Sequence, residues 1–149
     1  MWRAIGMARE DERNGEVPVG AIVIGSDGGI LAAAANRTIK NIDPTAHAEI
    51  LALRTAATRV NNYRLVGSTV YTTLEPCAMC AGALVNARVA RVVFGATDER
   101  FGGAVTHFGI CDSDILNHKV EVVGGVLADE CRELLQEFFR AKRAVSSKA

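Results

Sequence analysis

The sequence has no excess of charge of either sign, because 17 Lys and Arg residues are balanced by 17 Asp and Glu residues. Proteins that bind nucleic acid contact its phosphates with Lys and Arg, and a neutral chain has no overall positive field that would indicate such a partner. The zero net charge therefore argues mildly against a nucleic-acid substrate. A small basic patch remains compatible with this balance.

Long apolar runs are also missing. No run reaches the roughly 18 residues of a membrane-spanning helix, and residues 1–16 become polar too soon for a secretory signal peptide. We therefore expect a cytoplasmic protein with no membrane partner. In that compartment, the four cysteines are better explained as metal ligands or reduced thiols than as disulfides.

Internal repeats, low-complexity tracts and linkers are absent, and 149 residues, 49% of them hydrophobic, suffice for one domain with a core. We interpret residues 1–149 as a single domain. The patterns predict, in chain order, a helix at 2–14, strands at 19–24 and 30–36, a helix at 44–59, a strand at 68–73, a short helix from about 77, strands at 89–96 and 119–126, and a helix from about 127. This order predicts an α/β fold, a three-layer α-β-α sandwich with a central five-stranded mixed sheet.

His47 and Glu49 stand in the small, apolar stretch TAHAEI. Asp43 is the expected N-cap of this helix, and Pro44 its first residue. On a helix, residues two apart point about 200° away from each other, so His47 and Glu49 cannot bind one metal ion side by side. His47 is then the candidate ligand, with Glu49 reaching over the substrate. A buried structural histidine and a capping glutamate are the alternatives if each residue is taken separately.

Cys77 and Cys80 form a CxxC pair at the start of a predicted helix. Side chains three residues apart on a helix point to one side, which lets two thiolates bind one metal ion. Pro76 suits the helix start, and a helix N-terminus favours the thiolate form. A redox pair or two buried thiols are the alternatives.

His47, Cys77 and Cys80 together make three ligands. Four-coordinate zinc would then keep one position for water, which is typical of a catalytic rather than a structural site. A fourth protein ligand would make the site structural, and the sequence spacing leaves four candidates open: His107, Cys111, His118 and Cys131.

The motifs His47-Ala48-Glu49 and Pro76-Cys77-Ala78-Met79-Cys80 resemble the signature of the zinc-dependent cytidine and nucleobase deaminases. Within that superfamily, the chain looks most similar to the bacterial tRNA adenosine deaminases, which convert the wobble adenosine to inosine. Further stretches that carry the resemblance are EVPVGAIV at 16–23, DPTAHAEILALR at 43–54, TLEPCAMCAGAL at 73–84 and RVVFGATD at 91–98.

The resemblance implies a cytidine deaminase-like fold and one Zn²⁺ ion per subunit, held by His47, Cys77 and Cys80. It implies hydrolytic deamination of adenosine in a tRNA anticodon stem-loop, a homodimer, and no organic cofactor. In such an enzyme Glu49 is the catalytic residue, carrying a proton from the zinc-activated water to N1 of adenine and then to the leaving amine.

The same resemblance assigns substrate contacts. Asn36 stands where the family hydrogen-bonds the base, Asp98 where it contacts a neighbouring ribose, and the Ala48 backbone amide near the zinc-bound water. Without the resemblance, Asn36 is equally well a turn residue at the end of a strand, and Asp98 a loop carboxylate.

Aromatic and cationic residues are interleaved at 138–143, in the predicted C-terminal helix. Such segments can stack bases and hold phosphates, so Phe139 and Arg140 are candidate substrate contacts. The alternative is an amphipathic helix with solvated cations and with Leu134, Leu135, Phe138 and Phe139 in the core. We expect a mixture of the two, in which most of the apolar side is core and Arg140, Lys142 and Arg143 form a candidate RNA edge.

The loop at 103–108, Gly-Ala-Val-Thr-His-Phe, departs from the Gly-Ala-x-Gly-Ser-like run of the tRNA enzymes, and His107 and Cys111 have no counterpart there. Loops beside a deaminase pocket select the base and its context, so the change is either neutral or alters substrate choice. One alternative function is therefore deamination of another nucleic-acid strand or of a free nucleobase or nucleoside. A zinc-stabilised RNA-binding module without activity is a second, against which the intact Glu49 argues.

Overall fold

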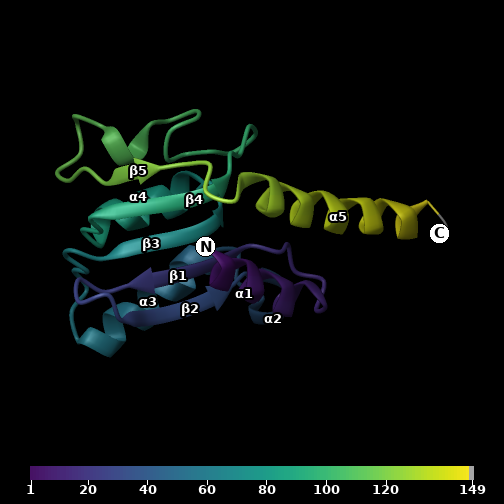
Figure 1. Ribbon diagram of the computed structural model, residues 1–149, viewed down its shortest axis with the longest axis horizontal. Helices are drawn as coiled ribbons and strands as arrows, with labels where there is room; N and C mark the ends of the chain where they lie inside the picture. The colour runs from purple at the N-terminus through teal and green to yellow at the C-terminus, as the bar shows by residue number, and fades with distance from the viewer. Residues whose placement is uncertain (148–149) are drawn as a thin grey trace.

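One mixed β-sheet with helices on both faces forms the body of the protein, in a computed structural model that describes residues 1–147 (Figure 1). The helices are α1 (Trp2–Glu12), α2 (Thr38–Asn41), α3 (Ala48–Val60), α4 (Ala78–Asn86) and α5 (Ala128–Ser146), with a short 3₁₀ helix η1 (Ile110–Asp112). The strands are β1 (Gly20–Ile24), β2 (Ile30–Ala35), β3 (Thr69–Leu74), β4 (Arg91–Ala96) and β5 (Glu121–Val123).

The sheet has the strand order β2-β1-β3-β4-β5. Strand β1 pairs antiparallel with β2 and with β3, while β3, β4 and β5 run parallel to one another. In the register, Val23 faces Val70, and Val70 faces Val92. The predicted five-stranded mixed sheet is confirmed.

Two separate clusters of buried side chains show that the sheet has a helical layer on each face. The larger cluster joins α3 and α4 to one face, and Ala48, Ala52 and Ala56 supply it from α3. These alanines recur every four residues and so form one side of the helix. The smaller cluster joins α1 and α5 to the other face, where the buried Cys131 lies beside Ala96 and Leu134. This arrangement confirms the three-layer sandwich.

The helix that carries Glu49 begins later than predicted. Asp43 and Pro44 do not start it, because the Asp43 carboxylate accepts the N–H and the hydroxyl of Thr45 and so closes a turn. The first helical residue is Ala48, and His47 precedes it in an extended conformation, with φ −73° and ψ 152°. Because His47 lies before the helix, the expectation that the side chains of His47 and Glu49 point in opposite directions does not apply.

Strand β5 and helix α2 also differ from the predictions. Strand β5 is confined to Glu121–Val123, because Gly124 and Gly125 follow and Gly125 has φ 85°. The short helix α2 was not predicted, and the buried Glu16 accepts hydrogen bonds from Thr38, Ile39 and Lys40 at its start. These bonds come from a residue more than 20 positions away, which local sequence patterns do not reveal.

Helix α5 projects past the ends of the strands towards the C-terminus (Figure 1). Phe138 is buried at 5% exposure, but Phe139 is 43% exposed, so the alternative that places Phe139 in the core does not hold. The C-terminal part of α5 extends beyond the strands (Figure 1), so its side chains there have no sheet to pack against. None of the helices described over residues 1–147 combines the length and apolar character needed to cross a membrane.

Candidate metal centre

The three predicted ligands converge at the start of two helices. His47 precedes α3 and Cys77 precedes α4, both in extended backbone conformations, and Cys80 lies in the first turn of α4. Two residues separate Cys77 from the end of β3, so the centre sits at the carboxyl end of that strand. Helix N-termini carry partial positive charge, which favours thiolate at both cysteines.

The spacing of the donor atoms fits one zinc ion. His47 Nδ1 lies 3.6 Å from Cys77 Sγ and 3.6 Å from Cys80 Sγ, and all three donor atoms lie within 4.8 Å of one another. Tetrahedral zinc with ordinary Zn–N and Zn–S bonds would place nitrogen and sulfur about 3.6 Å apart. The donor set and its geometry therefore both suit Zn²⁺.

The two thiols have different acidities. A hydrogen bond from Cys80 lowers the pKa of Cys77 to about 4; burial opposes this shift, and His47 adds to it. The same hydrogen bond, together with burial, raises the pKa of Cys80. The bond to Cys77 raises the pKa of His47 against the effect of burial. Because a bound metal dication favours thiolate, zinc binding would release the Cys80 proton as well.

Glu49 lies beside this centre and is almost fully enclosed, at 3% exposure. Burial raises its carboxyl pKa, while the neighbouring His47 acts in the opposite direction. Its Oε2 lies 3.5 Å from Cys80 Sγ and is a second acceptor within reach of that thiol's single proton. The Thr72 hydroxyl lies 3.3 Å from Oε1 and 3.2 Å from the Leu74 carbonyl, and it can donate to either. A carboxyl group with a raised pKa beside a metal centre suits proton transfer near neutral pH.

A fourth protein ligand is not found among residues 1–147, where the cluster contains His47, Cys77 and Cys80 alone. The histidines considered as a fourth ligand are engaged elsewhere: His107 Nε2 lies 2.7 Å from the Glu99 carbonyl, and His118 Nε2 lies 2.8 Å from the Val89 carbonyl. Cys111 and Cys131 are fully buried in the two hydrophobic clusters. Three ligands leave a coordination position for solvent, as in catalytic zinc sites.

Asn36 and Ala48 are brought together at the centre. Asn36 follows β2, and its Oδ1 accepts the backbone N–H of Ala48 at 2.9 Å. Asn36 is itself 8% exposed. Its acceptor oxygen is thus held by the first residue of α3, which fixes the orientation of its NH₂ group.

Asp98 lies in the loop after β4, where its Oδ1 accepts the backbone N–H groups of Arg100 and Phe101. Phe139 and Arg140 are exposed on α5, which packs against β3 and β4 in the layer opposite α3 and α4. The structure therefore gathers Glu49, Asn36 and Ala48 around the metal ligands. It does not place the two α5 residues in that cluster.

Glu75 was missed by the sequence interpretation. It separates β3 from Pro76 and Cys77, is 1% exposed, and accepts hydrogen bonds from the loop after β4. The one signal in the sequence was the position of Glu75 directly after an apolar strand, in TLEPC. A carboxylate that is buried at such a position needs hydrogen-bond donors around it.

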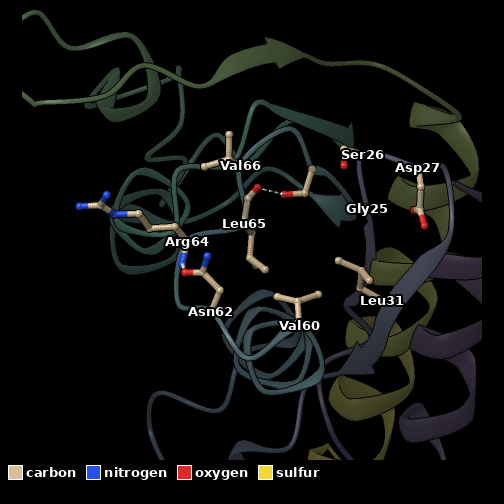
Figure 2. A pocket seen from close by; sticks show the side chains of 10 residues that line it. Gly25, Ser26, Asp27, Leu31, Val60, Asn62, Arg64, Leu65 and Val66 are labelled. Carbon is tan, nitrogen blue, oxygen red and sulfur yellow. Dashed lines mark hydrogen bonds between the residues drawn. The ribbon is translucent and has the colours of Figure 1, made fainter.

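A groove of about 380 Å³ lies at the other end of the sheet (Figure 2). Leu31, Val60, Leu65 and Val66 surround it, and Ser68 donates a hydrogen bond to the Leu65 carbonyl in its wall. The groove adjoins the end of α3 and the start of β3, whereas His47 and Cys77 adjoin the start of α3 and the end of β3. It is therefore separate from the metal centre.

Comparison with known proteins agrees with this geometry. Residues 1–96 match the family described as the cytidine and deoxycytidylate deaminase zinc-binding region. The chain belongs to this deaminase family. It is 46% identical to a tRNA-specific adenosine deaminase of Haemophilus influenzae over 96% of this chain and 83% of that protein. It is 44% identical to a tRNA-specific adenosine deaminase of Bacillus subtilis over 96% of this chain and 88% of that protein.

Solved structures of deaminases share the fold. One, from studies of A-to-I editing by tRNA:A34 deaminases at the wobble position of transfer RNA, superposes with a TM-score of 0.87 at 37% identity, covering 91% of this chain and 97% of that one. A guanine deaminase from Nitrosomonas europaea superposes with a TM-score of 0.79 at 26% identity, covering 91% of this chain and 80% of that one. The predicted cytidine deaminase-like fold is confirmed.

Proposed function

We propose that this zinc-dependent deaminase hydrolyses adenosine to inosine at the wobble position of a tRNA anticodon loop, with one Zn²⁺ per subunit. The observation that carries the proposal is the pairing of a three-ligand metal centre with a buried carboxylate, Glu49, in a chain 46% identical to a tRNA-specific adenosine deaminase. An anticodon loop presents unpaired bases, which a deaminase pocket requires.

Glu49 is the proposed catalytic residue. Zinc held by His47, Cys77 and Cys80 would supply Lewis acidity, which lowers the pKa of a water molecule towards about 7. Glu49 accepts a proton from that water and delivers it to N1 of adenine, while the remaining hydroxide adds to C6. Glu49 then moves the hydroxyl proton of the C6 adduct to the exocyclic amine, so that the C6–N bond breaks, ammonia leaves and C6 keeps the oxygen of inosine. Burial raises its pKa above that of an exposed carboxyl group, which favours a group that both accepts and donates a proton. The Thr72 hydroxyl lies 3.3 Å from Oε1, where it can donate a hydrogen bond that orients the carboxylate.

Asn36 is the proposed base contact. Since Ala48 occupies its Oδ1, the NH₂ group remains to donate a hydrogen bond to a purine acceptor. The Ala48 N–H itself is engaged by Asn36, so this amide contributes by fixing Asn36 and by lining the site beside the water. Asp98 is proposed to contact the ribose of a neighbouring nucleotide, through the carboxylate oxygen left by its turn.

The RNA backbone and neighbouring bases are proposed to reach α5. Phe139 is 43% exposed and free to stack on a base, and Arg140 follows it on the helix. Lys142 is less available than the sequence suggested, because its Nζ lies 3.2 Å from the Gly15 carbonyl and 4.8 Å from the Phe138 ring centroid. Proteins bind single strands by stacking bases on aromatic side chains and by holding phosphates with a local group of cations. A local group of cations is compatible with zero net charge of the whole chain.

A homodimer, a cytoplasmic location and a single domain over residues 1–149 are further parts of the proposal. Helix α4 presents a small apolar surface, with Ala78 and Met79 exposed and Gly82 and Ala83 half-buried. Small apolar residues on one helix can pack against the same helix of a second copy in a two-fold interface. The cytoplasm is where a tRNA substrate would be met.

Deamination of a free purine is the second candidate. Its support is the superposition with a guanine deaminase at a TM-score of 0.79. The identity of 26% to that protein, against 46% to a tRNA-specific adenosine deaminase, favours the RNA substrate.

One experiment separates these functions. The zinc-loaded protein is incubated with an anticodon stem-loop carrying a wobble adenosine, and in parallel with free adenine, guanine, cytosine and their nucleosides. Inosine in the RNA supports the proposal. Ammonia from small molecules alone supports the second candidate, and no product from any of them supports a binding module without activity.

A further inference from the structure

Glu75 is a buried carboxylate that is neither a metal ligand nor part of an ion pair among the described residues. Its side chain is satisfied by four donors from one loop. Oε1 accepts the backbone N–H groups of Val105 and Thr106, at 3.0 and 2.9 Å. Oε2 accepts the N–H of Asp98 at 3.1 Å and the hydroxyl of Thr106 at 2.6 Å. The carboxylate thus joins both ends of the segment 98–106.

The same segment is packed on the chain that leads to the metal ligands. The N–H groups of Gly103 and Ala104 donate to the Pro76 carbonyl, at 2.8 and 3.2 Å. Gly102 forms an isolated antiparallel bridge with Cys77. A Cβ at Gly102 would collide with the Asp98 carbonyl and the Glu75 carboxylate, and one at Gly103 with the backbone of Ala78. The loop backbone therefore lies directly on the turn that carries Cys77.

Glu75 stands between these two sets of contacts. It is the residue before Pro76, and its hydrogen bonds reach the loop that carries Asp98. A buried carboxylate is costly unless donors surround it, so its four bonds have one well-defined geometry. Any movement of the loop against the metal-ligand turn would break several of them together. The carboxylate is thus placed to set the position of the loop rather than to take part in the reaction.

We propose that Glu75 is a positioning residue that fixes segment 98–106 against the metal-ligand turn, and so holds Asp98 and Phe101 where the nucleotides beside the target base bind. This inference rests on the proposed RNA substrate. Phe101 is 67% exposed, and Asp98 carries the backbone N–H that Glu75 accepts.

The test compares wild type with Glu75→Gln, which keeps the shape of the side chain. The amide oxygen introduced by Glu75→Gln could still accept two of the four hydrogen bonds. The NH₂ group would replace the other oxygen and would face two donors that it cannot accept. Thr106→Val removes the donated hydroxyl, and Thr106→Ser restores it. Ser68→Ala is the matched control, because it removes a buried hydrogen bond at the other end of β3. The readouts are zinc content, amide hydrogen exchange, hairpin Kd, and kcat and KM for the hairpin.

We expect Glu75→Gln to retain one zinc per subunit and to accelerate exchange at Asp98, Val105 and Thr106 by roughly tenfold or more. Kd and KM for the hairpin should rise by about tenfold, with kcat changed much less. Thr106→Val should shift the same quantities in the same direction, and Thr106→Ser and Ser68→Ala should leave them near wild type.

Two results would overturn the inference. One is loss of zinc with a fall in kcat, which would make Glu75 a support of Cys77 only. The other is unchanged loop exchange with unchanged Kd and KM. A wild-type protein that binds the hairpin without converting it would contradict the proposed function alone, because exchange and Kd still report on Glu75. A wild-type protein that does not bind the hairpin would contradict both.

Discussion

The Nδ1 atom of His47 lies 3.6 Å from Sγ of Cys77, although the two residues are 30 positions apart and precede different helices. Each stands in an extended conformation immediately before the first helical residue. Two helix starts therefore present an imidazole and two thiols to one point, and the first turn of α3 brings Glu49 beside them.

Replacing Glu49 should separate metal binding from catalysis. Glu49→Gln and Glu49→Ala should both keep one zinc per subunit, because the three ligands are unchanged. Inosine formation should fall by at least about 10²- to 10⁴-fold, the usual contribution of general acid–base catalysis. Zinc analysis and single-turnover assays on an anticodon hairpin measure the two quantities. Near wild-type ammonia release would remove Glu49 from the mechanism.

Asn36 allows its two hydrogen-bonding ends to be tested separately. Asn36→Asp keeps an acceptor for the Ala48 N–H but removes the NH₂ donor proposed for the base. It should fold with near wild-type stability and lose kcat/KM for RNA. Asn36→Ala loses both ends, leaves the Ala48 N–H unsatisfied, and should also lower the free energy of unfolding by about 1–3 kcal/mol. Equal activity of Asn36→Asp and wild type would exclude the base contact.

Metal removal should expose a difference in reactivity between the thiols. In chelated protein at pH 7, iodoacetamide should modify Cys77 first, because its pKa is about 4 and it is half-buried. Burial raises the pKa of Cys111 to about 11 and also raises that of Cys131, so both should react slowly. Zinc-loaded protein should be protected at Cys77 and Cys80. Mass spectrometry of peptides reads out the order, and preferential labelling of Cys80 would contradict it.

Glu75 should make stability depend on acid pH. Burial alone would raise its pKa, but the hydrogen bonds from Thr106, Val105 and Asp98 outweigh this and lower the pKa from 4.5. Its folded pKa is thus below the unfolded one, so its stabilising contribution is complete above about pH 4.5 and is lost as pH falls through the folded pKa. The stability advantage of wild type over Glu75→Gln, measured by urea unfolding, should therefore shrink on acidification below pH 4.5. A stability difference between wild type and Glu75→Gln that increases as the pH falls would contradict this prediction.

Phe138 and Phe139 are neighbours with different expected roles. Phe138 is 5% exposed, and its truncation to Ala should cost about 3 kcal/mol of unfolding free energy. Phe139 is 43% exposed, so Phe139→Ala should change stability little but weaken hairpin binding. Arg140→Glu should also weaken binding and flatten its salt dependence. Unchanged Kd in both Phe139→Ala and Arg140→Glu would leave this face of α5 merely solvated.

The sequence was sufficient for the features that depend on local patterns and residue chemistry. The strands, the C-terminal helix and the three metal ligands follow from apolar periodicity and from a histidine and two cysteines in recognisable motifs. The late start of α3 did not follow, because Asp43 satisfies the same preference for a capping residue by closing a turn with Thr45. The burial of Glu75 depends on four donors that arrive from a loop more than 20 residues away, and no spacing rule links them.

The most direct test measures inosine in an anticodon stem-loop with a wobble adenosine, after incubation with wild-type and Glu49→Gln proteins that both contain one zinc per subunit. Wild type should convert that adenosine, and Glu49→Gln should convert almost none. Product from neither protein, or equal product from both, would contradict deamination of the RNA base through Glu49 at this metal centre.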